Sequence, residues 1–313
     1  MDRSWDLLNQ GQTHAARLSA QKALEIKRNA PDAHNLLGYI YALEGAFDAA
    51  LEHYRTAMEL DEWFLDPILN AAELLAHPDA DPNEAIRLCR NAADNMELSA
   101  EETADAALIE IEALMSLNNE AEACSRVYEA LSHPEPLSET YVTMFGRILY
   151  ECGDILGATQ LIQRLDDVTS PTADTWYLRG LLAREQGHRI DAVKAFSATR
   201  DADLLLPPVE WAPSPDEWLQ SLRAAIQLLP AQQQDSLINA EVHVFPYPTQ
   251  AMVQDEQDPR QILRLRHVLP EHNAFGEILF FTRNAERMLS PLHPEADLAR
   301  YLAGELDPIE TEH

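Results

Sequence analysis

The sequence predicts an all-α superhelix of helix hairpins over residues 1–205, followed by a small α+β domain. Three observations lead to this fold class. Small residues recur with a period of about 34 through the first two thirds of the chain. A group of prolines interrupts the helical pattern after Asp203. Beyond the prolines, apolar residues alternate with polar ones, which is typical of strands.

The clearest hairpin covers Asn35 to Leu60, where Gly45 separates two helical stretches. The residues expected to meet across the pair are small or aromatic: Gly38, Tyr41, Ala50, Tyr54 and Ala57. Small side chains let two helices approach closely, and the aromatic rings fill the space beside them. One such pair cannot bury its apolar face alone, so further pairs are expected on either side.

These further pairs are visible as counterparts of Gly45, Ala50 and Ala57 along the chain. In order, they are Gly11, Ala16 and Ala23; Ala85 and Ala92; Ala123, Val127 and Ala130; Gly153, Ala158 and Ile162; Gly187, Ala192 and Phe196. The set resembles the tetratricopeptide (TPR) motif, a helix–turn–helix repeat of about 34 residues. Six repeats would cover residues 1–205. The register of the first helix of the fourth, Thr103 to Leu117, stays open.

The chain is strongly acidic, with a formal net charge of -30. Residues 1–205 carry 16 basic and 36 acidic residues, and residues 206–313 carry 7 and 17. Such a field repels phosphates, so no nucleic-acid partner is expected. A solvated surface explains the acidity, and a groove for basic partners is the sharper alternative.

The cysteines and the hydropathy indicate a cytoplasmic protein without membrane contact. Cys89, Cys124 and Cys152 are odd in number and widely spaced, which suits a reducing compartment. No run of about 18 apolar residues appears, and the start MDRSWDLLNQ does not have the pattern of a secretory signal.

The prolines after Asp203 predict an extended linker at residues 206–215, because proline fixes φ and removes a backbone donor. A domain over residues 216–313 would follow. Its expected elements are helices at Asp216–Leu229, Arg283–Leu289 and Glu295–Leu306, and strands at 241–248, 262–268 and 278–282.

The order of motifs in residues 216–289 resembles the minimal zincin-like metallopeptidases. The matching pieces are Leu229-Pro230, the strand from Val242 to Pro248, Asp258-Pro259 with Ile262-Leu263, and the stretch from Ile278 to Asn284. The resemblance implies a final helix with two His residues at i and i+4 and a Glu between them. The helix expected here, residues 294–306, has no His.

The resemblance therefore implies a degenerate domain, a pseudo-metallopeptidase with no catalytic residue, no metal and no cofactor. Its histidines His267, His272, His293 and His313 lie on no single helix face. The rival interpretation from the enzyme class is a metal-dependent hydrolase with an atypical site made of His267, His272, His293 and Glu305. Bound zinc would favour that rival.

The TPR resemblance implies that the first helix of each pair lines a concave groove for a peptide or helix. The groove positions carried onto this chain are Asn35, Tyr39, Leu69, Glu73, Thr143, Arg147, Tyr150, Tyr177, Leu181 and Arg184. The Lys and Arg clamp of co-chaperone repeats is not matched, because its slots hold Trp5, Asn35, Tyr39 and Glu73.

The sequence thus favours a bacterial-type, non-enzymatic scaffold or adaptor that binds a protein or peptide partner, with a basic partner as the sharper hypothesis. A secretion or assembly chaperone is compatible with the same features. The identity of the partner, the pathway and the oligomeric state are left open by the sequence.

Overall fold

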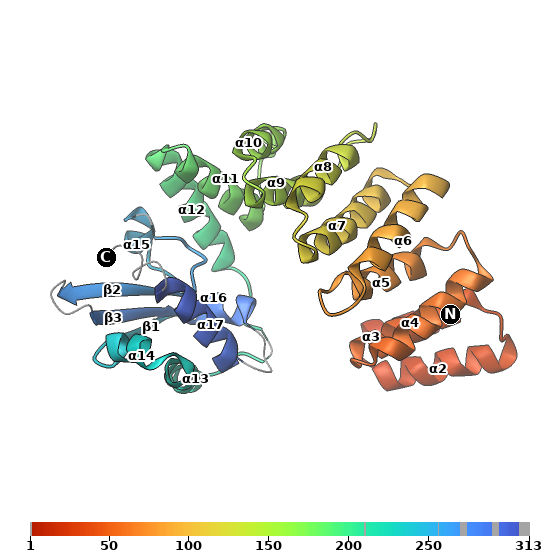
Figure 1. Cartoon of the computed structure of the whole chain (residues 1–313), viewed down its shortest axis with the longest axis horizontal. Helices are drawn as coiled ribbons and strands as arrows, with labels where there is room; N and C mark the ends of the chain where they lie inside the picture. The colour runs from red at the N-terminus through yellow and green to blue at the C-terminus, as the bar shows by residue number, and fades with distance from the viewer. Residues whose placement is uncertain (1, 210, 256, 270–273, 290–293, 307–313) are drawn as a thin grey trace. The chain divides into compact units, whose positions relative to one another are not determined.

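The structure is a computed structural model that describes residues 2–209, 211–255, 257–269, 274–289 and 294–306. The chain divides into two compact units, Met1–Leu165 and Asp166–His313. Helices dominate both units, and the C-terminal unit also contains a sheet of three strands (Figure 1).

The N-terminal unit contains five helix pairs. They are α1 (Asp2–Asn9) with α2 (Thr13–Ile26), α3 (Pro31–Leu43) with α4 (Phe47–Leu60), α5 (Leu65–Ala76) with α6 (Pro82–Asn95), α7 (Ala100–Ser116) with α8 (Glu120–Ala130), and α9 (Glu139–Glu151) with α10 (Ile155–Gln163). The predicted hairpins of the first five repeats are therefore confirmed, with the fourth now in a defined register.

Positive φ angles turn the chain between the helices of four of these pairs. Gly11, Gly45 and Gly153 have φ of 72°, 75° and 82°, a conformation that favours glycine because it has no Cβ. In the fourth pair Asn118 takes this conformation, with φ of 57°. Asparagine tolerates it better than other residues with a side chain, and its use here explains why the Gly pattern does not reveal the fourth repeat.

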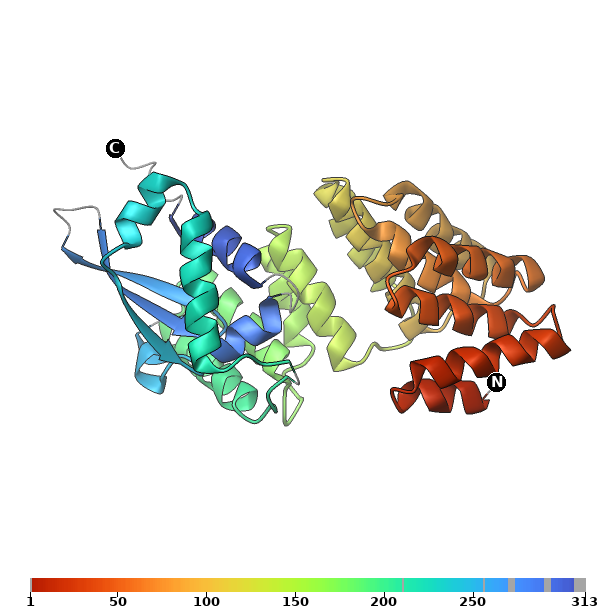
Figure 2. The same cartoon turned by 90° about the horizontal axis from the view of Figure 1, so that it is seen from below.

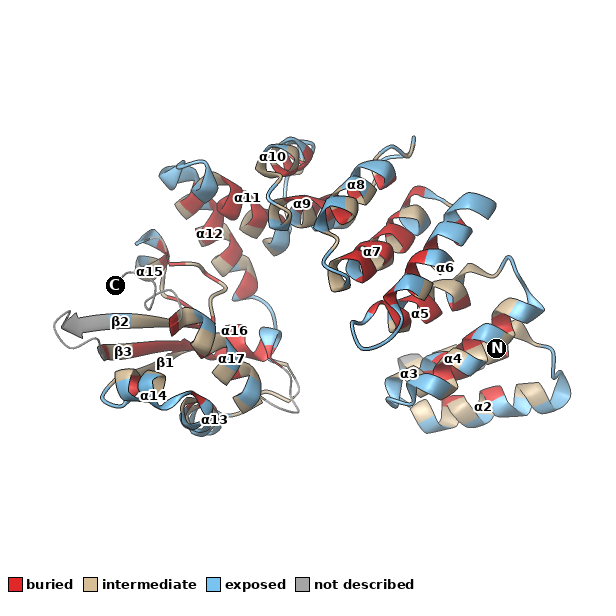
Figure 3. Ribbon diagram, in the orientation of Figure 1, coloured by how far each residue is buried: buried red, intermediate tan, exposed pale blue. Residues whose placement is uncertain are grey.

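Helices within a pair approach closely at the small residues. A Cβ placed on Gly38 would lie 2.5 Å from the ring of Tyr54, which is itself fully buried. Ala50 and Ala57 are also buried, and Figure 3 shows buried residues along the facing sides of paired helices. The predicted role of the recurring small residues is thus confirmed for this pair.

The first helices of the second, third and fourth pairs form a row. Helices α3, α5 and α7 pack directly on one another in turn, while α4 packs on α5 and α6 packs on α7. Because α3, α5 and α7 contact one another directly, the first helices lie closest together along one side of the stack of helix pairs. We refer to the solvent-exposed side of this row as the first-helix face.

The C-terminal unit begins with the sixth predicted hairpin. Its elements are α11 (Ala173–Glu185), α12 (Arg189–Asp203), α13 (Pro215–Leu228), α14 (Ala231–Leu237), β1 (Glu241–Phe245), α15 (Gln250–Gln254), β2 (Leu263–Leu269), β3 (Ala274–Phe281), α16 (Thr282–Met288) and α17 (Pro294–Leu306). The described residues between α12 and α13 form neither helix nor strand. All twelve helices expected for the repeats are present.

The sheet has the order β1-β3-β2, with β1 parallel and β2 antiparallel to β3. Helices α13 and α17 pack on each other, and Figure 2 shows α13 at full length crossing the strands. The core contains Trp218 and Leu222 of α13, Leu302 of α17 and Phe280 of β3, all buried. Trp218 and Phe280 meet edge to face, with ring centroids 5.7 Å apart.

The three helices and three strands that the sequence predicted for this α+β part are present, and their ends differ from the predicted ones by a few residues. The third strand is longer than expected, since β3 begins at Ala274. Helices α14 and α15 were not predicted, because they are short and have no repeating apolar face. The zincin-like identity of this part stays a prediction.

Candidate functional site

In four helix pairs, the first helix has a small residue (Gly38, Ala72, Gly146 or Gly180) at the predicted contact with the second helix. The predicted groove includes the residue that directly follows it. In the N-terminal unit this position holds Tyr39, Glu73 and Arg147, and all three side chains are exposed. In the sixth pair it holds Leu181, which is 7% exposed. The predicted groove residues at this position are therefore exposed in residues 1–165 and buried in the sixth pair.

Two of the predicted groove residues are buried in the N-terminal unit. Asn35 is 2% exposed, and its Oδ1 accepts a hydrogen bond of 3.0 Å from Nδ2 of Asn70. This bond joins α3 to α5, so Asn35 holds neighbouring first helices together. Thr143 of α9 is also buried. Leu69 and Tyr150 are half-buried.

Aromatic and charged side chains accompany the exposed positions. The rings of Trp5 and Tyr39 lie 5.7 Å apart, which extends the apolar surface from α1 to α3. Arg147 pairs with Glu151 one turn later, at 2.8 Å. Glu73 is exposed on α5. The exposed positions thus carry an aromatic pair on α1 and α3, an acidic side chain on α5 and an ion pair on α9.

Three carboxylates lie on the first turns of successive first helices: Asp32 on α3, Asp66 on α5 and Glu102 on α7. We call this set the acidic rim. Partial shielding from water raises the pKa of Asp66, and the neighbouring carboxylates of Glu102 and Asp32 raise it further. Glu102 itself accepts a backbone hydrogen bond of 2.8 Å from Ser99, which lowers its pKa.

The acidic rim was missed at the sequence level. Asp32, Asp66 and Glu102 are separated by about one repeat each, so the signal was present in the spacing. At Asp66, partial shielding from water and the neighbouring carboxylates both disfavour the charged state. A bound cation would relieve this repulsion, so the rim is suited to basic side chains.

In the sixth pair the predicted groove residues contact the chain's own C-terminal part. The hydroxyl of Tyr177 donates a hydrogen bond of 3.0 Å to Asp258, and Arg184 lies 3.6 Å from the same carboxylate. The guanidinium of Arg260 lies over the Tyr177 ring, 4.8 Å from its centroid. Tyr177 and Arg184 are therefore engaged within the unit.

A buried carboxylate anchors this contact. Asp203, the last residue of α12, is 1% exposed and pairs with Arg260 and Arg287, each at 3.0 Å. Its carbonyl oxygen accepts a hydrogen bond of 2.8 Å from the Tyr247 hydroxyl. These contacts explain why the unit boundary lies at Leu165, before the sixth pair, whereas the sequence suggested residue 205.

The structure places only part of the rival hydrolase site. Glu305 on α17 is half-buried, and its Oε2 accepts a hydrogen bond of 3.2 Å from Gln261. Burial raises the pKa of Glu305. His272, His293 and His313 lie outside the described residues, as does the side chain of His267. Within the described ranges, no group of three or more His, Cys, Asp or Glu could hold a metal ion.

None of the described helices is both long and apolar enough to span a lipid bilayer.

Comparison with known proteins agrees with the helix hairpins. Residues 31–62 match the family model of the tetratricopeptide repeat. No curated protein matches the chain. Among solved structures, the chain is similar to PilF of Pseudomonas aeruginosa, with 20% identity and a TM-score of 0.53, over 64% of this chain and 88% of that one.

A second similar structure is PilW, described as a widely conserved type IV pilus biogenesis factor. It shares 16% identity with a TM-score of 0.55, over 66% of this chain and 92% of that one. At these identities the likeness concerns the fold alone. The family model covers the second helix pair, and the similar structures share the arrangement of helix pairs.

Proposed function

We propose that this tetratricopeptide-repeat chain is an interaction scaffold whose first-helix face in residues 1–165 binds a basic segment of a partner protein. The observation that carries the proposal is the acidic rim, two members of which lie on the helices that also carry the exposed Tyr39 and Glu73. Three carboxylates repeat at the spacing of the helix pairs, so an extended segment could meet one carboxylate at each step. Shielding from water raises the pKa of Asp66 and repulsion from Glu102 and Asp32 raises it further; lysine and arginine side chains would relieve that repulsion.

The test is partner capture with the full chain as bait, followed by kinetics on the partner identified. We expect Glu73→Lys to weaken binding by lowering the association rate, since charges of opposite sign steer association. Affinity should also fall between low and physiological salt, where the Debye length is about 8–10 Å. Glu59→Lys, on the exposed side of α4, is the matched control. Affinity that is independent of salt and of Glu73 would overturn the basic partner and favour an apolar interface.

We further propose that the α+β part is a non-catalytic platform. The support is helix α17, where Leu298 and Leu302 are buried in the core and Glu305 accepts a hydrogen bond from Gln261. Calorimetry of the full chain with chelator and with added zinc tests this. Unchanged melting is expected, and a chelator-induced drop of several degrees would support the metal-dependent hydrolase, because a bound ion stabilises the native state.

The cytoplasm is the proposed location. Cys89, Cys124 and Cys152 are free thiols in the structure, which suits a reducing compartment. Fractionation of cells that produce the tagged chain tests this, and recovery with extracytoplasmic markers would contradict it.

A further inference from the structure

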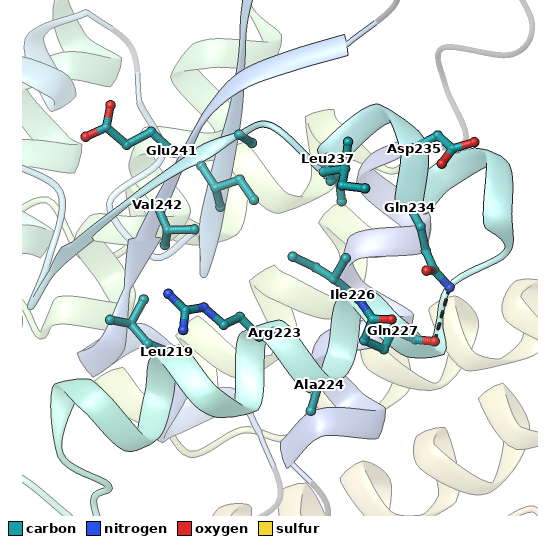
Figure 4. A pocket seen from close by; sticks show the side chains of 13 residues that line it. Leu219, Arg223, Ala224, Ile226, Gln227, Gln234, Asp235, Leu237, Glu241 and Val242 are labelled. Atoms are coloured by element: carbon teal, nitrogen blue, oxygen red, sulfur yellow. Dashed lines mark hydrogen bonds between the residues drawn. The ribbon is translucent and has the colours of Figure 1, made fainter.

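A cavity in the C-terminal unit lies between α13, α14 and β1. Its volume is about 770 Å³. Leu219 and Ile226 of α13, Leu237 of α14, Ile238 directly after α14, and Val242 of β1 give it apolar walls (Figure 4). Ile238 is 73% exposed at this site. The volume is within the range of pockets that bind small molecules or peptide side chains.

The strand that borders the cavity is an edge of the sheet. Within the described residues β1 pairs with β3 alone, because the strand order is β1-β3-β2. A strand presents backbone N–H and C=O groups on both sides, so the outer side of β1 offers unpaired groups. An extended peptide can add to such an edge and gain main-chain hydrogen bonds.

A cationic side chain stands at the wall of the same cavity. Arg223 projects from α13 between Leu219 and Val242, and the carboxylate of Glu241 is turned away from it (Figure 4). Among the described residues no carboxylate lies within ion-pairing distance of Arg223, in contrast to Arg260 and Arg287, which both pair with Asp203. The carboxylates of Asp235 and Glu241 also line the cavity, and Arg223 is its guanidinium. A guanidinium beside apolar walls is complementary to a carboxylate on an apolar body.

We propose that this cavity binds the C-terminal end of a partner polypeptide with an apolar last residue. The main chain of the peptide would extend along β1, its last side chain would enter the apolar cavity, and Arg223 would donate hydrogen bonds to the terminal carboxylate. A free edge strand favours a peptide over a fatty carboxylate, which has no backbone to pair. This site is independent of the first-helix face.

The test measures binding of fluorescent octapeptides to the full chain. The peptides have randomised last four positions and are prepared with a free carboxylate and as C-terminal amides. We expect enrichment of free-acid peptides that end in an aliphatic or aromatic residue. Amidation should weaken the selected peptides about tenfold or more, as loss of a charge-assisted hydrogen bond implies.

Matched variants separate this site from other surfaces. Arg223→Gln should reproduce the effect of amidation, whereas Arg164→Gln, at another exposed arginine, should not. Ile238→Ser should weaken binding, whereas Leu228→Ser, at an exposed leucine outside the cavity lining, should not. Equal binding of acids and amides, no selected peptide, or binding of dodecanoate without binding of peptides would overturn the proposal.

Discussion

The second and sixth helix pairs use the same position in different ways. In the second pair Asn35 of α3 accepts a hydrogen bond from Asn70 of the following first helix. In the sixth pair the equivalent residue is Tyr177, three positions before Gly180 as Asn35 is before Gly38. The proline-rich residues that follow α12 do not continue the repeat pattern, and Tyr177 instead donates to Asp258. Asp258 is thus a hydrogen-bond partner of Tyr177, as Asn70 is of Asn35.

This difference shows how the stack of repeats ends. A repeat buries its apolar face against the next one, so the last repeat needs a cap with a polar outer surface. Here the segment Gln257–Gln261 and helix α15 meet α11 and α12 of the sixth pair. The C-terminal part is therefore a cap on the sixth pair, while the first-helix face of the N-terminal unit keeps Tyr39 and Glu73 exposed.

The largest expected effect is on the cap. Asp203→Ala would leave Arg260 and Arg287 without their shared buried partner. Removing one member of a buried charge cluster costs about 3–5 kcal/mol, so urea unfolding of the full chain should show a loss of that size. The control is Asp201→Ala, since Asp201 is exposed and pairs with Arg200 at the surface, where such pairs contribute about 0–1 kcal/mol. Equal losses in the two variants would mean that Asp203 does not anchor the cap.

A smaller effect is expected at the glycines, and it should be similar in the two units. A Cβ on Gly38 would lie 2.5 Å from the Tyr54 ring, and one on Gly180 would lie 2.4 Å from the Phe196 ring. Leucine at either position should overpack the helix pair and cost about 1–3 kcal/mol of unfolding free energy. Gly304→Ala, where no atom lies within 4 Å, should instead stabilise by about 0.5–1 kcal/mol. A leucine variant as stable as the parent would contradict the close packing.

The smallest effect is expected from pH and concerns the N-terminal unit. The Nδ1 atoms of His34 and His53 lie 3.0 Å apart, and His53 stacks on Tyr41. Burial lowers the pKa of His53 below 6.5, His34 lowers it further, and Glu52 opposes the shift. The unfolded chain therefore takes up the proton first as the pH falls, so stability should be lost below about pH 6.5.

Urea unfolding at pH 7.5 and 5.5 checks this pH dependence. The parent should lose more stability on acidification than His53→Gln, which has no imidazole at this position. If the variant loses as much as the parent, other groups cause the acid sensitivity.

Local features of the chain predicted the helix pairs, and contacts distant in sequence explain what was not predicted. Gly38 and Gly180 each mark a close approach between the two helices of their own hairpin. The regular spacing of such small residues along the chain is therefore enough to identify the helix pairs. Tyr177 and Asp258 are 81 residues apart, and no periodicity links them. For the predicted groove, too, a contact between different repeats was not predicted. Its exposed residues Tyr39 and Glu73 were expected, but the burial of Asn35 depends on Asn70 in the next repeat.

The most direct test of the account compares photo-crosslinking from two first helices. Benzoylphenylalanine replaces Tyr39 in one full-length variant and Tyr177 in another, and each is irradiated with the partner found by capture. We expect an adduct with the partner from position 39 and none from position 177, where Asp258 accepts from the Tyr177 hydroxyl and Arg260 lies over its ring. An adduct from position 177 without one from position 39 would contradict it.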